Sequence, residues 1–568
     1  MKNVITNAAD ITVLRLIDNT LKTGGGPASV GATVVMASKG PVGKVTQVTD
    51  ANWQQIFGKP LNKKATGMEG LRHLADAVKE CNYVNVVRVV AADAKFPSIS
   101  VTTATGLATN ASHAYNTALS LGVGMCLQVW PIDGDPSTKR SMEIKDIVTD
   151  KGAWATLTAY AVNDVITVTG GRLICIAAHS AGATAPTLAM PGVQWKAYDG
   201  KFDNRATINF YDKDSEDIEY LLETYLVGFD VNDTDDIGRP AYIETVLEQN
   251  STRFRANWDE AVTFTSATVG LKAFIKTTFT GGTNGADPIT AEWKTAWDLF
   301  RNETYLANLM FAAGNIDTDV IANCLDIASK RHVSFFFDVS PLLPAASALI
   351  WIKSLGQDQR QGAAYYCPYE ANDPFYGGKT VWGVSGDAVA ACARGDQNYT
   401  GSTPGIHYAP AGSTRARLTR TGIKPIFPEQ ALNRDDFYDA RINPVTASDS
   451  GGATIDDCLS IHYKQDYSRF IWVNRIANYI DARFVEGAAY MKFEPDGLTR
   501  NGLTKLTKQI LDELVTSGAL VPPRDKTAGT TPYVLKVEQV EIDLWLVTWD
   551  FCPTGAARRI AGQPRLIK

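Results

Sequence analysis

The amino-acid sequence predicts a multidomain protein of mixed α/β and α+β class, and three observations support this. Its 568 residues exceed the roughly 250–300 residues at which a single hydrophobic core stops growing. Between residues 201 and 371, predicted strands and helices alternate in the order that builds a parallel sheet. Residues 96–200 are instead rich in Thr, Ala, Ser and Gly, with short alternating apolar runs that indicate an inserted β-rich domain.

We expect six parts along the chain. They are an N-terminal arm (1–26), the first part of an α+β core domain (27–95), the inserted β-rich outer domain (96–200), a Rossmann-like α/β middle domain (201–371), the rest of the core domain (372–550) and a C-terminal arm (551–568). The middle domain contains the clearest series, a β-α-β-α-β unit with strands at 271–279, 306–312 and 333–338 and helices at 290–300 and 317–330.

Composition and charge exclude several function classes. Hydrophobic residues make up 45% and charged residues 20% of the chain, which is typical of a globular protein. The formal net charge of -6 provides no basic field for nucleic acid. Eight scattered cysteines form no CxxC pair, so we expect reduced thiols and no zinc site. The N-terminus lacks a signal-peptide core and the apolar runs are too short to span a bilayer, so we expect synthesis in the cytosol and no membrane insertion.

Both ends of the chain resemble arms that need a partner. Ile11, Val13 and Leu16 alternate like a strand, and a Gly-Gly-Gly tether follows them. After Asp550 the chain contains no acidic residue but carries basic and apolar side chains, namely Arg558, Arg559, Ile560, Arg565, Leu566 and Ile567. Such a tail either frays or adds a strand to a neighbour's sheet edge, and its composition favours the second.

A helix followed by a loop is predicted at 385–412. Ser385 is placed to serve as N-cap, Asp387 lies in the first turn, and small residues form a stripe that allows close packing until Gly395 ends the helix. No nucleophile and base have catalytic spacing here. The segment therefore indicates a part that fits against other copies of the same chain.

The last third of the chain contains two amphipathic helices and a strand. In the second helix Leu503, Leu506, Ile510 and Leu514 face inward, and Lys505 and Lys508 lie on the opposite face. The apolar residues of 540–546 alternate with Glu541, Asp543 and Trp545, which predicts a strand there.

Three patterns allow a different chemistry. The sequence before and after Ser180 resembles a nucleophile elbow, which would make the chain an α/β hydrolase, although alanine replaces the first glycine and no helical stripe follows. The turn 281–285 is glycine-rich but lacks a nucleotide-binding fingerprint. The acidic run 230–236 is most simply a solvated loop, with loose calcium binding as the alternative.

A set of short motifs in order along the chain resembles one family, the tail sheath proteins of contractile-tailed phages. The motifs are Lys39-Gly40-Pro41, Val86-Val87-Arg88-Val89, Gly281-Gly282-Thr283-Asn284-Gly285, Phe337-Asp338-Val339, Ala364-Tyr365-Tyr366-Cys367-Pro368, the 385–396 helix with Gly405 and Ala409-Pro410-Ala411, Phe493-Glu494-Pro495-Asp496 and Gly518-Ala519-Leu520. The 96–200 insertion and the loop 396–405 have no counterpart among these motifs.

The resemblance implies a structural subunit that polymerises as stacked rings around a tail tube and contracts to drive the tube through the host envelope for genome ejection. It implies extended arms that complete a neighbour's sheet, and as partners the chain itself, the tube protein, the baseplate and the tail terminator, in the virion tail. No catalytic residue, metal or cofactor is required. Ser385, Arg394, Asp396 and Pro410 are expected in packing, and Arg500, Lys505 and Lys508 are expected to face the tube. The sheath of a tailocin or type VI-like injection system is the alternative.

Overall fold

The computed structural model describes residues 29–62, 70–103, 107–115, 117–136, 139–214, 216–235, 237–262, 274–428, 432–447 and 452–559. The chain forms two compact units. We call the first the core unit (Met1–Ala37, Lys44–Val89 and Trp293–Lys568) and the second the inserted unit (Ser38–Gly43 and Val90–Glu292). This division differs from the predicted boundaries at 95/96 and 200/201, because strands from distant parts of the sequence pair with one another.

One eight-stranded sheet organises the core unit, in the order β2-β3-β1-β18-β19-β20-β24-β25. Its strands are β1 (Val30–Val35), β2 (Val45–Val48), β3 (Tyr83–Arg88), β18 (Leu309–Phe311), β19 (Ser334–Asp338), β20 (Gly362–Tyr366), β24 (Ile442–Ala447) and β25 (Ala453–Ile455). The neighbours from β3 to β24 are parallel, whereas β2 and β25 are antiparallel edge strands. The predicted core and middle domains therefore share a single sheet.

Helices cover both faces of this sheet, because successive side chains of a buried strand point to opposite sides. In β19, Phe336 belongs to one core cluster, and Phe335 and Phe337 belong to the other. The Phe336 side is covered by α1 (Trp53–Phe57), α2 (Gly70–Val78), α7 (Ser385–Asp396), α9 (Ile471–Ala488) and α10 (Asp496–Thr516). The other side is covered by α4 (Thr290–Asp298), α5 (Thr318–Lys330), α6 (Ala345–Ser354) and α8 (Arg434–Asp439). Strands buried on both faces read as continuous apolar runs, as β19 does.

Part of the predicted β-α-β series is present. Asp317 caps α5 by accepting hydrogen bonds from the amides of Asp319 and Val320, and α5 connects the parallel strands β18 and β19. The strand predicted at 271–279 is different. Only β17 (Thr277–Thr278) is found in the described part of that range, and it pairs with a strand of the inserted unit.

The inserted unit is built on two four-stranded sheets. One contains β16 (Phe254–Trp258), β6 (Met125–Pro131), β4 (Lys95–Thr102) and β5 (Ala108–Ala114), and the other contains β15 (Glu219–Gly228), β14 (Arg205–Lys213), β7 (Ser141–Asp146) and β17. A shared apolar core includes residues of both sheets and of α3 (Ile243–Asn250). The β-rich character predicted for the insertion is observed, but it continues past residue 200 because β14 pairs with β7.

A small lobe extends from this pair of sheets. It contains β8 (Thr149–Ala153), β9 (Ala159–Tyr160), β10 (Asp164–Val168), β11 (Gly171–Cys175), β12 (His179–Ser180) and β13 (Trp195–Tyr198). Apolar clusters around Trp195 and Val165 form its own core. The lobe is inserted between β7 and β14, whose residues Asp146 and Ala206 are register partners.

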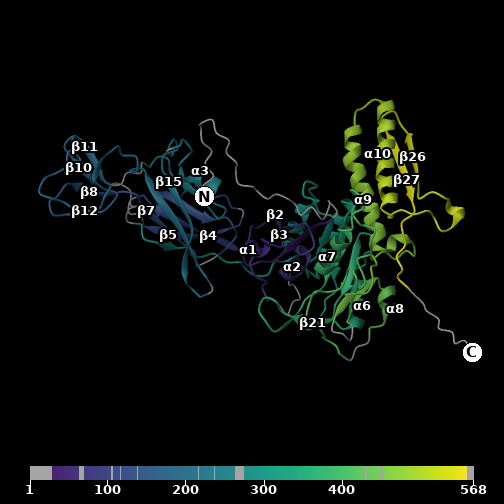
Figure 1. Ribbon diagram of the computed structural model, residues 1–568. Coiled ribbons are helices and arrows are strands. Elements are labelled where there is room, and N and C mark those ends of the chain that lie inside the picture. The colour runs from purple at the N-terminus through teal and green to yellow at the C-terminus, as the bar shows by residue number, and fades with distance from the viewer. Residues whose placement is uncertain are drawn as a thin grey trace, which may run out of the picture. The chain divides into compact units, whose positions relative to one another are not determined.

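The C-terminal part of the core unit has two long helices and a hairpin beside them (Figure 1). The hairpin consists of β26 (Tyr533–Gln539) and β27 (Trp545–Phe551). The strand predicted at 540–546 is mostly wrong, because 540–544 form the hairpin turn and the second strand begins at Trp545. Three short strands, β21 (Tyr369–Asn372), β22 (Lys379–Val381) and β23 (Lys424–Pro425), form a separate sheet.

Candidate functional site

The hairpin β26–β27 is a two-stranded sheet with open edges. Leu535 pairs with Trp549 and Val537 with Val547, and no third strand pairs with either side among the described residues. A two-stranded hairpin is only marginally stable in water, and unpaired edges offer rows of N–H and C=O groups to another strand. The geometry therefore suits strand addition.

The two faces of the hairpin differ in what they contact. One face packs on the long helices: the rings of Phe484 and Trp549 lie 4.9 Å apart, and the Tyr533 hydroxyl donates to Asp512 at 2.5 Å. The three aromatic side chains are only half-buried, and on the other face Val534 and Leu546 are exposed. The apolar surface is therefore incompletely covered within one chain.

The predicted arm residues can be placed only in part. Ile11, Val13, Leu16, Ile560, Arg565, Leu566 and Ile567 lie outside the described residues. Arg559 is exposed. Arg558 binds its own chain, since its guanidinium donates to both oxygens of Asp457 at 2.7 and 2.5 Å and lies 4.5 Å from the Tyr438 ring. Arg558 thus holds the base of the C-terminal arm on its own chain, and its contact with a neighbour stays a prediction.

The start of α7 is capped by a residue from another element. The Asp338 carboxylate, at the end of β19, accepts hydrogen bonds from the amides of Val384 at 2.6 Å and Ser385 at 3.1 Å. The Ser385 side chain makes no cap, so the prediction of Ser385 as N-cap is wrong. The predicted stop at Gly395 is also wrong by one residue, because α7 continues to Asp396.

The Ser385 hydroxyl instead faces a buried histidine of α2. Its Oγ lies 3.1 Å from His73 Nδ1, and the same nitrogen lies 3.7 Å from Asp338 Oδ2. Burial lowers the pKa of His73. A catalytic triad needs the nucleophile and the orienting carboxylate on opposite ring nitrogens and access for a substrate. Here both partners face one nitrogen and all three side chains are buried, so the cluster is structural.

A second buried cluster joins α2, α7 and the loop that carries Arg420. Arg420 Nη2 lies 2.5 Å from Asp387 Oδ2 and 3.4 Å from Asp76 Oδ2, and the Trp382 indole donates to Asp76 at 3.0 Å. Burial raises the pKa of Asp387 to about 7 against the attraction of Arg420. Burial also acts to raise the pKa of Asp76, but Arg420, Lys79 and Trp382 together lower it. The Arg420 guanidinium therefore pairs with two carboxylates whose pKa values are shifted in opposite directions.

The other predicted signature residues also lie in packing contacts. Asp396 is fully buried and accepts from Arg475 of α9 at 2.6 and 2.7 Å and from Ser29 at 3.1 Å. Arg394 is partly exposed and donates to Glu80 at 3.0 Å. Pro410 is buried. Ser385 and Asp396 lie at the two ends of α7. This helix packs closely on α2, so that a Cβ added to Gly386 of α7 would lie 2.1 Å from the carbonyl oxygen of His73 in α2.

Comparisons with known proteins identify the structural neighbours of the chain. The sheath tail protein of Desulfitobacterium hafniense aligns over 95% of this chain and 100% of its own, at 11% identity and a TM-score of 0.47. The anti-feeding prophage helical sheath in the contracted state aligns over 49% of this chain and 76% of its own, at 16% identity and a TM-score of 0.37. The sheath complex of the extracellular contractile injection system PVC, also contracted, aligns over 46% and 70%, at 16% identity and a TM-score of 0.37.

All three of these neighbours are described as sheath proteins. No protein-family model matches the sequence, and no curated protein matches it.

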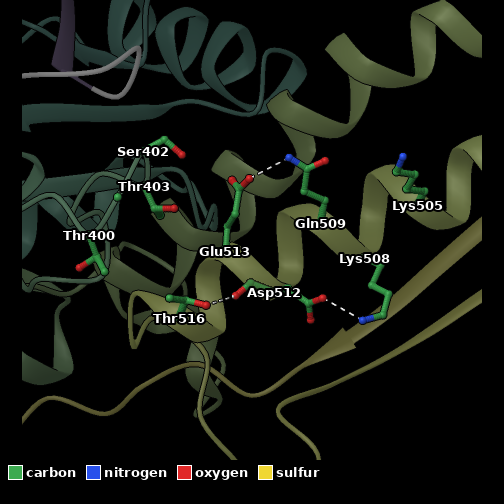
Figure 2. A pocket seen from close by; sticks show the side chains of 10 residues that line it. Thr400, Ser402, Thr403, Lys505, Lys508, Gln509, Asp512, Glu513 and Thr516 are labelled. Carbon is green, nitrogen blue, oxygen red and sulfur yellow. Dashed lines mark hydrogen bonds and ion pairs between the residues drawn. The ribbon is translucent and has the colours of Figure 1, made fainter.

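The three cations predicted to face a tube lie on α10, and all are exposed. Lys505 and Lys508 line a groove of about 540 Å³ between the loop 400–403 and the C-terminal half of the helix (Figure 2). Lys508 pairs with Asp512 at 2.9 Å, whereas Lys505 has no ion-pair partner among the described residues. Arg500 is not part of the groove lining.

The hydrolase alternative fails at Ser180. The elbow motif requires a strand, a sharp turn and a helix. Ser180 instead lies in the two-residue strand β12, which pairs with β9, and the described residues from 181 to 242 contain no helix. Its neighbour His179 faces the Ala177 carbonyl oxygen at 2.9 Å.

The other two alternatives also have local explanations. In the acidic run, Arg205 binds both oxygens of Asp233 and Arg239 binds Asp235, so those carboxylates are occupied by guanidinium groups. In the glycine-rich turn, the Asn284 amide donates to the Ser38 carbonyl at 3.0 Å and Thr283 pairs with Lys95, which ties segments of the inserted unit together.

The described residues hold no group of three or more His, Cys, Asp or Glu placed to bind a metal. None of the described helices combines the length and apolar character that a membrane crossing needs. All eight cysteines are free thiols, and seven of them are buried.

Sequence analysis missed the polar side of α2. Arg72, His73 and Asp76 are all buried, and Arg72 makes a bidentate ion pair with Asp373 at 2.5 and 2.9 Å. The signal was available, because these ionisable residues lie on a nine-residue helix that directly precedes the buried strand β3. Their partners come from residues about 300 positions later in the chain, which a local pattern does not indicate.

Proposed function

We propose that the chain is the structural subunit of a contractile phage tail sheath. The observation that carries the proposal is the open hairpin β26–β27, whose edges are unpaired and whose apolar faces are incompletely covered within one chain. Strands added from other copies complete such a sheet with main-chain hydrogen bonds. The alternating apolar residues of the N-terminal arm and the basic and apolar C-terminal arm supply suitable strands.

Strand exchange between copies builds a polymer rather than a closed pair. The hairpin and the arms are different surfaces, so the contact is head-to-tail and repeats along a helical tube. In the proposed particle, stacked rings of the chain surround a tail tube between a baseplate and a tail terminator, in the tail of the virion. Contraction is a switch between two packings of the same subunits, and it drives the tube through the host envelope for genome ejection.

The proposal requires no enzymatic chemistry, because the energy is stored when the extended polymer assembles. Arg500, Lys505 and Lys508 are the cations that we propose to face the tube, and Arg558 anchors the C-terminal arm. The same subunit design serves a tailocin or a type VI-like injection system, and the two contexts differ in whether a capsid is attached. An electron micrograph of the native particle separates them.

Negative-stain microscopy of the purified full chain tests the proposal. We expect tubes or polysheaths of constant diameter. A protein that stays monodisperse and monomeric over a range of salt and protein concentrations contradicts the proposal.

A further inference from the structure

Three exposed aliphatic side chains form a row at one end of the lobe sheet. Val162 precedes β10, Ile176 follows β11 and Val193 precedes β13. These strands are neighbours in the sheet and antiparallel to one another, so all three positions fall at the same end. The side chains are 52%, 52% and 82% exposed, respectively. We call these three residues the strand-end row.

Main-chain hydrogen bonds hold the strand-end row in a fixed order. The Asn163 amide donates to the Cys175 carbonyl, and the Ile176 amide donates to the Gln194 carbonyl, both at 2.8 Å. Neighbouring strands lie roughly 4.8 Å apart, so the row is continuous, with Ile176 in the middle. A surface that is already ordered loses little conformational entropy when a partner binds.

The segments that carry the row are free of charged side chains. Neither 154–163 nor 173–195 contains an Asp, Glu, Lys or Arg. Among the flanking charges, Asp164 is buried and lies 3.7 Å from Lys151, and Lys196 is exposed on β13. Turns usually hold polar residues, whereas grouped apolar side chains in solvent mark contact surfaces. The row is therefore a contact surface that lacks charge.

The chemistry of the row excludes several occupants. Nucleic acid and anionic lipid headgroups are bound through Lys and Arg, which the row lacks. A hydrocarbon layer would leave the N–H and C=O groups of these loops without hydrogen-bond partners. A charged peptide finds no counter-ion in the row. An uncharged aliphatic protein surface remains, and every copy of this chain presents one.

We propose that the strand-end row of one copy packs on the same row of a second copy around a two-fold axis. Two identical charged surfaces would repel each other, but this surface has no charge to oppose the approach. An axis through the middle of the row exchanges its ends, so Ile176 meets the partner's Ile176 and Val162 meets the partner's Val193. The contact goes beyond the proposed sheath function, because it closes after two copies whereas head-to-tail contacts continue.

Cysteine cross-linking of the full chain tests this geometry. A disulfide requires Cα atoms roughly 4.4–6.8 Å apart. Ile176→Cys, in a Cys175→Ala background that removes the adjacent thiol, should form covalent dimers by itself. Val162→Cys and Val193→Cys should not do so separately, because each lies at least about 10 Å from its symmetry mate. An oxidised mixture of these two variants should give a heterodimer on a non-reducing gel.

Val123→Cys is the matched control for cross-linking. Val123 is a fully exposed valine of the inserted unit outside the lobe. The natural cysteines are buried apart from the half-buried Cys552, so they contribute little background. The dimer yield of Ile176→Cys should exceed that of Val123→Cys at least about tenfold, as expected for a specific contact. Equal yields from these two variants overturn the proposal.

A lysine in the middle of the row tests its apolar character. Ile176→Lys places two ammonium groups at the axis, so it should lower the heterodimer yield of the Val162→Cys and Val193→Cys mixture at least about tenfold. Val123→Lys should leave that yield unchanged. Both positions are exposed, and circular dichroism checks that the fold is retained. A yield that Ile176→Lys does not change contradicts the contact.

Two further measurements separate this contact from other arrangements. The parent chain should not sediment with neutral phosphatidylcholine vesicles. Sedimentation that Ile176→Lys abolishes would assign the row to lipid and overturn the proposal. Ile176→Lys should form the same tubes as the parent chain, and a loss of tubes with the fold retained would place the row in the head-to-tail contact instead of a two-fold one.

Discussion

Arg475 of α9 donates two hydrogen bonds to the carboxylate of Asp396 at the end of α7, at 2.6 and 2.7 Å, and both side chains are buried. Burial acts to raise the pKa of Asp396, and the neighbouring Arg475 and Ser29 oppose it. Because neither charge is solvated by water, each is stabilised by its ion-pair partner. The pair therefore fixes α7 against α9, the helix on which the β26–β27 hairpin packs.

We predict that Arg475→Met lowers the free energy of unfolding by about 3–5 kcal/mol, because it leaves the Asp396 charge buried without its partner. The combined variant Arg475→Met with Asp396→Leu should recover most of that loss. Urea unfolding measures both. Lys330→Ala is the control, since it breaks an exposed ion pair with Asp326 and should cost at most about 1 kcal/mol. Equal losses for Arg475→Met and Lys330→Ala would contradict this prediction.

Asp387 should make the stability of the core unit depend on pH in a defined direction. Its pKa rises from 3.8 to about 7 on folding, so between these values the folded state binds more protons than the unfolded state. The contribution of Asp387 to the free energy of unfolding therefore falls as pH rises through that window. The depressed pKa of His73 acts in the opposite direction, since its contribution is lost as pH falls below 6.5.

The variant Asp387→Asn isolates this effect, because asparagine resembles the protonated acid at every pH. Relative to the parent chain, its free energy of unfolding should increase as pH rises from 3.8 to about 7. Urea titrations at several pH values measure the difference. A difference that is constant with pH would show that Asp387 does not titrate in this window.

Two glycines in equivalent helix positions should respond in opposite ways to alanine. Gly386 is the second residue of α7, and an added Cβ would lie 2.1 Å from the His73 carbonyl oxygen. Gly386→Ala should cost at least about 2 kcal/mol by overpacking. Gly497 is the second residue of α10 and has open space around it, so Gly497→Ala should be neutral or stabilising by up to about 1 kcal/mol. Thermal unfolding of the two variants side by side makes the comparison, and similar melting temperatures would refute it.

Removing residues 560–568 should abolish tubes while the monomer stays folded, because the arm is then missing and Arg558 still binds Asp457. Negative-stain microscopy and circular dichroism give the two readouts. Arg558→Ala keeps the full arm and removes only its anchor, which separates the two contributions. Tubes of normal length from the truncated chain would exclude the C-terminal arm as an assembly element.

Local signals predicted the elements that depend on neighbouring residues. The helix at 317–330 was predictable from local signals, and so were the amphipathic faces of α9 and α10. Contacts between segments that are distant in the sequence could not be predicted from these local signals. Val30–Val35 pairs with Leu309–Phe311, and Ser141–Asp146 pairs with Arg205–Lys213, so the two compact units do not follow the boundaries drawn from composition.

The candidate site shows the same limit at the level of single residues. Ser385 has the chemistry of an N-cap, but Asp338 performs that role from a strand 46 residues away in sequence from Val384. The alternation at 540–546 is genuine, yet the chain reverses there because Val540 and Leu544 close the hairpin turn. A local pattern of side chains therefore predicts neither which backbone group lies opposite nor, at Val540, Ile542 and Leu544, which side chains are buried, since all three are exposed.

The register partnership of Asp146 and Ala206 makes the lobe between them exchangeable. The two strands already meet where the lobe begins and ends, so a short turn can join them in its place, and a foreign domain whose own termini lie close together can occupy the same position. In an assembled polymer every subunit would then carry one copy of that domain. If the chain assembles into the proposed sheath, it would thereby offer a regular scaffold for displaying enzymes or antigens at fixed spacing.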